Sequence, residues 1–465
     1  MEENKKIVTR FAPSPTGFMH VGGVRTAIFA YLWAKKNKGD FILRIEDTDK
    51  AREVEGSIEH IIESLNWLKV KYNLGPFIQS ERLDLYKKYA NILIEKGLAY
   101  PDPYTEEEVE IWRKEAEENK KPFLYREHRP ENFDTWDGTK PLRFKVPEIK
   151  RYEWEDSVFG KLSAGEEALD DFILIKGDGY PTYNFTHIVD DIEMNVTHVM
   201  RGQEFISSTP KFLSLYEGLG INPPIFVTLP PILGEKGTKK LSKRDGAKDI
   251  LDYRTEGYLP EAMFNFLAFL GWNPGGEKEI YSISELIEVF DINKIQKSGA
   301  KWNDEKLDWM NREHIKKLSE EEIEKNILEK LPENMRNPKL VPVIFDRISK
   351  WSDVNKMVEE GELDFFFNTL DYNKEKLNFK NTPSERTISN LKLAIETLEK
   401  IPEKDFNIDN IKNSLMSISM NLESKGELLH PIRYALSGKD KSPDPFIIAF
   451  ILGKNETINR LNKAI

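Results

Sequence analysis

The chain has 465 residues, 39% of them hydrophobic, and its length predicts about three domains. With 79 acidic and 68 basic residues it carries a net charge of −11, so a nucleic-acid site would have to be a local basic patch on an acidic protein. It contains no cysteine, which excludes disulfides and thiolate metal sites. The first residues lack the apolar segment of a signal peptide and no apolar run is long enough to span a bilayer, so we expect a cytoplasmic protein.

The first 45 residues predict a strand, a loop, a helix and a second strand. Residues 7–11 form a short apolar, β-branched run, and prolines and a glycine then break regular structure over 12–19. Apolar residues recur at helical spacing over 24–32, and 40–45 is a second apolar run. This order is the building block of a parallel nucleotide-binding sheet.

The turn before this helix carries His20, Gly22 and Gly23. Glycines at a helix N-terminus let backbone N–H groups approach an anion, the helix dipole favours negative charge there, and a histidine can add a donor. We interpret the turn as a site for the phosphates of ATP. On these residues alone, a helix start with an ordinary turn histidine is the alternative.

Carboxylates follow the second strand at 46–49, at the sheet edge where ligands of open α/β sheets bind. Glu46 could accept a hydrogen bond from an ammonium group. For Asp47 and Asp49 the alternative is an N-cap or first-turn position in the next helix, which is predicted over 58–68. We expect that alternative to hold for at least one of the two.

Beyond residue 100 the sequence predicts an interruption of this fold. Thr105 and Glu108 form a capping box for a charged helix, and 123–172 is strand-like and rich in turns, as in an insertion. The nucleotide fold resumes over 178–205 with a polar and aromatic set formed by Tyr180, Tyr183, Asn184 and Arg201.

Within this set, the planar fork of an arginine matches a carboxylate, whereas core packing is the commoner fate of tyrosines. No paired ligand spacing surrounds His187 or His198. We therefore expect both to be hydrogen-bonded core or loop histidines rather than metal ligands.

The last part of the chain predicts a basic loop and then helices. The loop reads KKLSKR at 239–244 between glycines, and a solvated charge run is its ordinary explanation. From about residue 310, Lys, Glu, Leu and Ile at helical spacing predict two α-helical units joined near 373–383. Thr382 and Glu385 predict a second capping box.

Together, HVGG at 20–23 and KLSKR resemble the paired signatures of class I aminoacyl-tRNA synthetases. The longer context, with PSPTG before HVGG, LRIEDTD at 43–49 and YPTYNF at 180–185, resembles the glutamyl-tRNA synthetases of the bacterial type, over nearly the whole chain. The resemblance implies an ATP-dependent glutamate–tRNA ligase. Such an enzyme forms glutamyl-adenylate with release of pyrophosphate, then transfers glutamate to the 3′-terminal ribose hydroxyl of tRNA(Glu) for protein synthesis.

The same resemblance implies the fold class and the domains. The fold is α/β, with a class I Rossmann-like catalytic domain split by an α+β insertion and followed by helical domains. The implied domains are the first catalytic half at 1–88, an inserted acceptor-end-binding domain at 89–178, the second catalytic half with the KLSKR loop at 179–246, a stem-contact domain at 247–322, and an α-helical anticodon-binding region at 323–465 with two subdomains that meet near 375.

Site residues are carried over by this resemblance. ATP would be held by His20, Gly22, Gly23, Lys240 and Lys243, of which His20, Lys240 and Lys243 are the implied catalytic residues. Lys243 would neutralise charge in the transition state. Glutamate would be held by Arg10, Ala12, Ser14, Glu46, Tyr183 and Arg201, with Glu46 on the α-ammonium and Arg10 nearest the side-chain carboxylate.

The resemblance also implies cofactors and partners. Mg²⁺ should accompany ATP without a dedicated protein cage, and no zinc is expected, because the insertion lacks the cysteines that hold it in some members. Arg347, in VPVIFDRISKW, resembles the anticodon-reading arginine of the family, and an ordinary surface arginine is the alternative. Two stretches depart from the family pattern, so we assign no substrate contact to His187, Gln203 or Phe205.

Several alternatives stay open. A non-discriminating enzyme would also charge tRNA(Gln). A small-molecule adenylyltransferase could use the first signature alone, but it would not need residues 310–465. The helical third could instead dock a protein. We expect a monomer.

Overall fold

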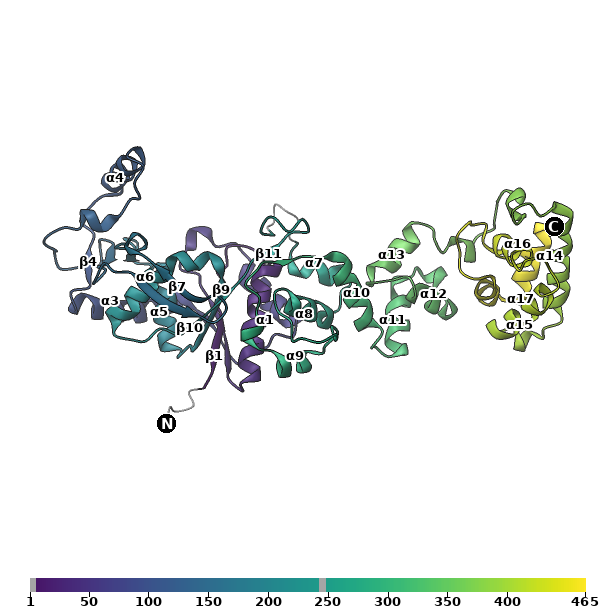
Figure 1. Ribbon diagram of the computed structural model, residues 1–465, viewed down its shortest axis with the longest axis horizontal. Helices are drawn as coiled ribbons and strands as arrows, with labels where there is room; N and C mark the ends of the chain where they lie inside the picture. The colour runs from purple at the N-terminus through teal and green to yellow at the C-terminus, as the bar shows by residue number, and fades with distance from the viewer. Residues whose placement is uncertain (1–5, 242–247) are drawn as a thin grey trace. The chain divides into compact units, whose positions relative to one another are not determined.

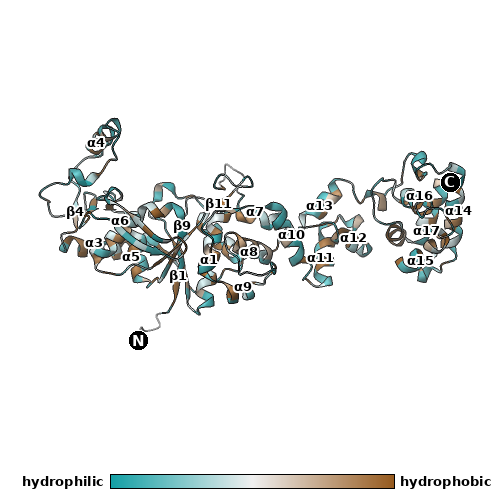
Figure 2. Cartoon of the chain, in the orientation of Figure 1, coloured by the Kyte–Doolittle hydropathy of each residue, from teal (hydrophilic) through white to brown (hydrophobic). Residues whose placement is uncertain are grey.

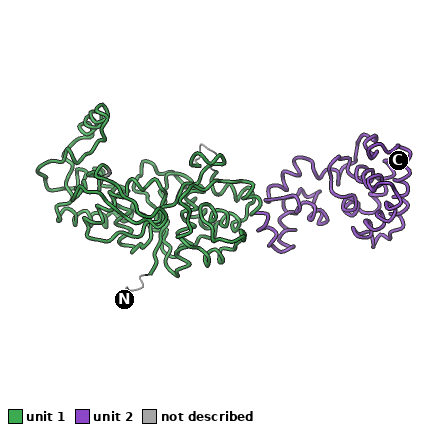
Figure 3. Tube along the Cα trace, in the orientation of Figure 1, with its two compact units in different colours: residues 1–310 green, residues 311–465 purple. Residues whose placement is uncertain are grey.

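The computed structural model describes residues 6–241 and 248–465, which fall into two compact units divided between residues 310 and 311 (Figure 3). The first unit is built on a seven-stranded sheet in the order β3-β2-β1-β9-β10-β6-β7. Figure 1 labels β1, β7, β9 and β10 of this sheet. Its strands are β1 (Val8–Phe11), β2 (Asp40–Ile45), β3 (Leu74–Ile78), β6 (Tyr152–Asp156), β7 (Gly160–Ala164), β9 (His198–Gly202) and β10 (Ile225–Leu229). Neighbouring strands are parallel except β6 and β7, so the predicted parallel sheet is confirmed.

The predicted strand–helix–strand unit forms as β1, α1 (Val21–Lys36) and β2. The return from α1 to β2 is tight, because a Cβ atom on Gly39 would lie 2.1 Å from the carbonyl oxygen of Ile7. The backbone N–H of Asp40 donates to that same oxygen at 2.9 Å. Only glycine therefore fits at position 39, in the connection between α1 and β2.

Helices cover both faces of the sheet. One core joins α1 with α8 (Pro260–Phe269) and α9 (Ile283–Val289), and the other joins α3 (Leu83–Glu95), α5 (Tyr183–Glu193) and α6 (Thr209–Leu219). Strand β2 contributes side chains to both cores, since Phe41 and Leu43 belong to the first core and Ile42 belongs to the second. This alternation is what a strand buried on both faces requires.

The chain between β2 and the next helix differs from the expectation. Helix α2 (Ser57–Trp67) begins after Gly56, which has a left-handed conformation, and a short 3₁₀ turn at 50–52 intervenes. Asp49 makes no capping bond, and Asp47 accepts instead from the backbone N–H of Ser80 at 2.8 Å. The N-cap role expected for one of these carboxylates was therefore wrong, because the chain reaches α2 several residues later.

The range predicted as an insertion, 89–178, contributes to two sheets. Strands β4 (Ala99–Pro101), β5 (Leu142–Phe144) and β8 (Ile173–Ile175) form an antiparallel sheet of their own, and β6 pairs with β10 in the main sheet. Helix α4 (Glu106–Glu118) starts with the predicted capping box, in which the backbone N–H of Glu108 donates to Thr105 Oγ1 at 3.2 Å. The domain boundaries remain predictions.

The second unit is α-helical, as predicted, and its helices carry both hydrophilic and hydrophobic residues (Figure 2). Pro383 takes the N-cap position of α14, and Thr382 Oγ1 donates to the carbonyl oxygen of Phe379 at 2.6 Å. The second predicted capping box is therefore wrong, because its hydroxyl is engaged before the helix begins. The helices are α11 (Glu320–Lys330), α12 (Val341–Phe345), α13 (Ser352–Glu359), α14 (Ser384–Glu399), α15 (Ile408–Ser419), α16 (Gly426–Ser437) and α17 (Pro445–Ala464).

The described residues also form α7 (Ile250–Thr255), α10 (Asp304–Ile315), several short 3₁₀ turns, and the paired strands β11 (Ile232–Leu233) and β12 (Ala300–Lys301). Across the two described ranges, every helix is too short or too polar to cross a membrane.

Candidate active site

A cavity of about 330 Å³ opens in the first unit where β1, β2, β9 and β10 end. This is the carboxyl edge of a parallel sheet, where ligands of open α/β folds bind. The lining residues are Arg10, Phe11, Ala12, Ser14, His20, Gly22, Gly23, Arg25, Thr26, Glu46, Tyr183, Met200, Arg201, Gly202, Glu204, Phe205, Leu229, Pro230, Pro231, Ile232 and Lys240. They include every predicted ATP and glutamate residue except Lys243, which lies outside the described residues.

The predicted phosphate turn forms the N-terminus of α1. His20 is the N-cap residue, and its Nδ1 atom accepts a hydrogen bond from the backbone N–H of Gly22 at 3.1 Å. The cavity is therefore bordered by the first turn of a 16-residue helix, whose dipole favours an anion. On the same cavity, Lys240 pairs with Glu204 at 3.1 Å, and both side chains are more than half exposed.

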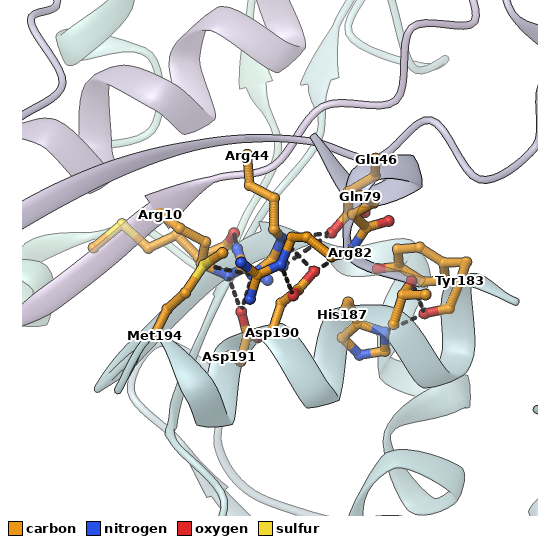
Figure 4. Close-up of polar contacts among 12 residues, drawn as sticks. Arg10, Arg44, Glu46, Gln79, Arg82, Tyr183, His187, Asp190, Asp191 and Met194 are labelled. Carbon is orange, nitrogen blue, oxygen red and sulfur yellow. Dashed lines mark hydrogen bonds and ion pairs between the residues drawn. The ribbon is translucent and has the colours of Figure 1, made fainter. Parts of the chain in front are cut away.

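Two further lining residues, Arg10 and Glu46, belong to a network of buried charges. Arg10 donates from Nε to Asp191 Oδ1 at 3.1 Å and from Nη1 to the carbonyl oxygen of Met200 at 3.2 Å. Arg44 donates to the same Asp191 oxygen at 2.8 Å and to Glu46 Oε1 at 2.9 Å (Figure 4). Through Arg44 and Asp191, the two predicted glutamate-binding side chains Arg10 and Glu46 belong to one network.

Asp190 anchors the far end of this network. Its carboxylate accepts hydrogen bonds from Gln79 at 2.8 Å, Arg82 at 2.9 Å and Tyr86 at 2.8 Å. Arg44 lies 3.7 Å from it (Figure 4). Together with the cavity arginine at 201, these groups form what we call the buried cluster: Arg10, Arg44, Arg82, Arg201, Glu46, Asp190 and Asp191, all buried except Arg82, which is partly exposed. Four arginines face three carboxylates, so the fully ionised cluster carries one net positive charge.

Burial and neighbouring charges shift the pKa values of Glu46, Asp191 and Arg201. Burial raises the pKa of Glu46, although Arg44 and Arg10 oppose the shift. Burial would also raise the pKa of Asp191, but Arg10 and Arg44 outweigh it and hold that pKa below its ordinary value. Burial lowers the pKa of Arg201 to about 10, which still leaves it protonated at neutral pH.

Arg201 has a hydrogen-bond donor that no described residue uses. Its Nη2 atom donates to Thr209 Oγ1 at 2.7 Å, while its buried Nε atom has no hydrogen-bond partner among the described residues. Its guanidinium lies 4.5 Å from the ring centre of Phe226 and 5.0 Å from that of Phe212. Because a buried cation with an unused donor is costly, this arginine is suited to an anionic ligand.

Tyr183 enters the cavity from the first turn of α5. Its ring stacks on that of His187 at 4.6 Å between ring centres, and the imidazole Nδ1 donates to the Tyr183 carbonyl oxygen at 2.6 Å. Burial lowers the pKa of His187 to about 3, so the ring is neutral at pH 7. Thr197 Oγ1 lies 2.9 Å from His198 Nδ1, and that histidine is also buried. The expectation of hydrogen-bonded core histidines is confirmed for both.

Sequence reasoning missed several cavity residues. Arg25 lines the cavity and is buried; it donates from Nη1 to the carbonyl oxygen of Leu270 at 3.0 Å, while its Nε atom has no hydrogen-bond partner among the described residues. Phe205 also lines the cavity, whereas Gln203, Tyr180 and Asn184 are absent from the lining. One feature of the sequence could have indicated Arg25: it is a charged residue among the apolar residues that form the buried face of α1.

Arg347 lies in the second unit. Its Nη2 atom pairs with Glu362 Oε2 at 2.6 Å, and the side chain is about half exposed at 46%. It borders a cavity of about 770 Å³ within that unit. The basic and apolar residues on this cavity include Lys339, Val343, Ile408, Lys441 and Phe450.

Comparison with known proteins gives two family matches. Residues 6–309 match the family described as "tRNA synthetases class I (E and Q), catalytic domain", and residues 300–465 match "Anticodon binding domain". A protein of Clostridium botulinum named "Glutamate--tRNA ligase" is 41% identical over 483 residues, covering 99% of this chain and 98% of that relative. A protein of the same name from Clostridium kluyveri is 40% identical, with 99% and 98% covered.

Two solved structures are similar over the full length. The glutamate tRNA ligase of Elizabethkingia meningosepticum, solved in complex with its amino acid, has a TM-score of 0.88 and 35% identity, with 99% of each chain covered. The glutamate-tRNA synthetase of Elizabethkingia anophelis has a TM-score of 0.85 and 34% identity, with 99% of this chain and 100% of that chain covered.

Proposed function

The chain belongs to the class I tRNA synthetases of the E and Q family, and on that premise we propose that it acts as an ATP-dependent glutamate–tRNA ligase. It forms glutamyl-adenylate from glutamate and ATP, releases pyrophosphate, and transfers glutamate to the 3′-terminal ribose hydroxyl of tRNA. The observation that carries the proposal is the cavity at the carboxyl edge of the sheet. It gathers all six residues assigned to glutamate and four of the five assigned to ATP.

The buried cluster suits an acidic amino acid. Glutamate brings one ammonium and two carboxylates, so its net negative charge offsets the net positive charge of the cluster, which glutamine would leave uncompensated. The unused Nε donor of Arg201 is available to one ligand carboxylate, and Arg10 to the other. Glu46 is available to accept from the ammonium.

Other residues of the same cavity suit ATP. Attack of a carboxylate on the α-phosphate needs both substrates held in line and cations near the departing pyrophosphate. The α1 N-terminus with His20, Gly22 and Gly23 supplies backbone donors for the phosphates. Lys240 is held by Glu204 and is expected to move to the phosphates when ATP binds. By resemblance, Lys243 neutralises transition-state charge and Mg²⁺ accompanies the nucleotide.

For the tRNA, we propose that the second unit contacts the anticodon and that Arg347 takes part. Its support is the match of residues 300–465 to an anticodon-binding domain. The same proposal includes domain boundaries at residues 88, 178, 246 and 322. It also includes a monomeric state and a cytoplasmic site of action. tRNA(Gln) is the second substrate to be tested.

The direct test is ATP–pyrophosphate exchange dependent on glutamate, with no tRNA, with tRNA(Glu) and with tRNA(Gln). Glutamate-dependent exchange supports the proposal, and its dependence on tRNA would show that the tRNA completes the site. Exchange with tRNA(Gln) supports a non-discriminating enzyme, to be checked by charging. No exchange with glutamate in any arm overturns the proposal.

The role of Arg347 has its own variants. Replacing it by alanine should raise the KM for tRNA in charging assays while the KM values for ATP and glutamate stay unchanged. Glu362→Gln is the matched control, since it removes the partner of Arg347 and keeps the guanidinium. Equal tRNA KM values for the alanine variant and the wild type would contradict the role.

A further inference from the structure

The residue just before one signature and a residue shortly after the other meet at His60 of α2. The backbone N–H of Met19, beside His20, donates to His60 Nδ1 at 3.3 Å. The other ring nitrogen, Nε2, lies 2.8 Å from both carboxylate oxygens of Asp249, which follows the KLSKR loop and caps α7. One imidazole thus contacts both segments.

The hydrogen bonds define the state of this ring. Nδ1 accepts from a backbone N–H, so the proton lies on Nε2 and is donated to the carboxylate of Asp249. The ring of Phe18 stacks on the imidazole at 4.6 Å between centres and 17° between planes. Neighbours on both edges and on one face leave His60 little freedom to rotate.

Among the described residues, the two segments also meet through backbone groups. The N–H of Ile250 donates to the carbonyl oxygen of Met19 at 3.0 Å, and His20 and Asp249 form an isolated bridge. His60 adds a side-chain link from a third element to this short contact. A shift of either segment would move the phosphate turn relative to the start of α7.

We propose that His60 is a positioning residue for glutamyl-adenylate formation, which holds the phosphate turn and the segment after the KLSKR loop in one relative position. The inference rests on the proposed function, because it concerns the ATP half of that site. The proposed role follows from the contacts of His60 with Met19 and Asp249, and it does not require the ring to touch a substrate atom. Loss of the His60 side chain should raise the KM for ATP. It should leave glutamate binding unchanged, because Arg10 and Glu46 belong to a separate network.

The test is the KM for ATP in glutamate-dependent exchange with the full chain and tRNA(Glu). His60→Ala should raise this KM about tenfold, the effect of one charge-assisted hydrogen bond, and leave the KM for glutamate within about twofold. Asp249→Ser keeps an N-cap hydroxyl and removes the carboxylate, so it should raise the ATP KM similarly. The double variant should resemble the single ones, because both remove the same link.

Two further variants separate positioning from folding. His60→Gln keeps an N–H donor toward Asp249 and His60→Asn keeps an acceptor toward Met19, so each should recover part of the ATP KM. Glu63→Gln is the matched control: Glu63 pairs with Arg254 at 2.8 Å and joins the same two helices without touching either signature. It should behave as the wild type.

The outcomes are distinct. An ATP KM for His60→Ala within twofold of the wild type, additive effects in the double variant, or an equal rise in Glu63→Gln each overturns the positioning role. If the alanine variant does not fold, the glutamine and asparagine variants decide, and wild-type behaviour of both overturns it. A wild-type protein without glutamate-dependent exchange overturns the proposed function instead.

Discussion

The Nε atom of Arg10 donates to Asp191 Oδ1 at 3.1 Å, and the same oxygen accepts from Arg44 at 2.8 Å. One buried carboxylate on α5 therefore holds two arginines that come from adjacent strands. Arg10 reaches the cavity from this anchored position. A carboxylate that does not line the cavity thus fixes a side chain that does.

Asp191→Asn should lower kcat/KM for glutamate by about 10- to 100-fold, the effect of losing one hydrogen bond to a charged group. It should leave the KM for ATP unchanged and destabilise the fold by about 3–5 kcal/mol, since buried Arg10 loses its ion-pair partner and Arg44 loses one of its three. The kinetics are measured by pyrophosphate exchange. Glu193→Gln is the control on the same helix, where Glu193 accepts from Tyr89 at 2.8 Å. Unchanged glutamate kinetics in Asp191→Asn would contradict the anchoring role.

Gly22→Ala should raise the KM for ATP several-fold. A Cβ atom at this position would lie 3.0 Å from His20 Cε1 and 3.2 Å from His20 Nδ1, so the imidazole must move. Alanine favours a helix more than glycine does, so a loss of ATP affinity would come from the displaced histidine or from the added methyl group in the cavity, and not from the helix. The comparison is Gly177→Ala, whose added Cβ meets its neighbours at 3.7 Å or more. Wild-type ATP kinetics in Gly22→Ala would argue against a role for the turn formed by His20 and Gly22 in ATP binding.

Stability should fall with acid because of His187. Burial lowers its pKa to about 3, against about 6.5 in an unfolded chain, so between these values only the unfolded state binds the proton. The stabilisation is complete above pH 6.5 and is lost as the pH falls toward 3, at about 1.4 kcal/mol per pH unit. Urea unfolding at pH 6.5 and 5 measures this loss. His187→Asn should flatten the dependence, and an unchanged slope would contradict the assignment.

The two predicted capping boxes should respond differently to alanine. Thr105→Ala removes a formed cap and should cost α4 roughly 1 kcal/mol, seen as about fivefold faster hydrogen exchange in its first turn. Thr382→Ala should leave exchange in the first turn of α14 unchanged, because the Thr382 hydroxyl does not cap that helix. Equal responses in the two helices would show that the second box forms in solution.

Local spacing was enough to predict the first strand–helix–strand unit and the helical second unit. The apolar residues of β1, α1 and β2 recur within a few positions of one another, and propensity acts over that same range. Resemblance then supplied the cavity residues, and the structure brings those it describes to one sheet edge. A local pattern also gave one wrong prediction. Thr382 was predicted to be the N-cap residue of α14, but the neighbouring Pro383 occupies that position.

The tertiary structure alone decided which charges are buried together. Asp191 lies far along the chain from Arg10 and Arg44, and no spacing rule connects them. The same holds for the pairing of β6 with β10, and for His60, which meets Met19 and Asp249 only after the sheet has formed. The physical reason is that propensity and periodicity act between near neighbours, whereas ion pairs, strand pairing and the positions of catalytic segments depend on which distant residues the folded backbone brings within hydrogen-bond distance.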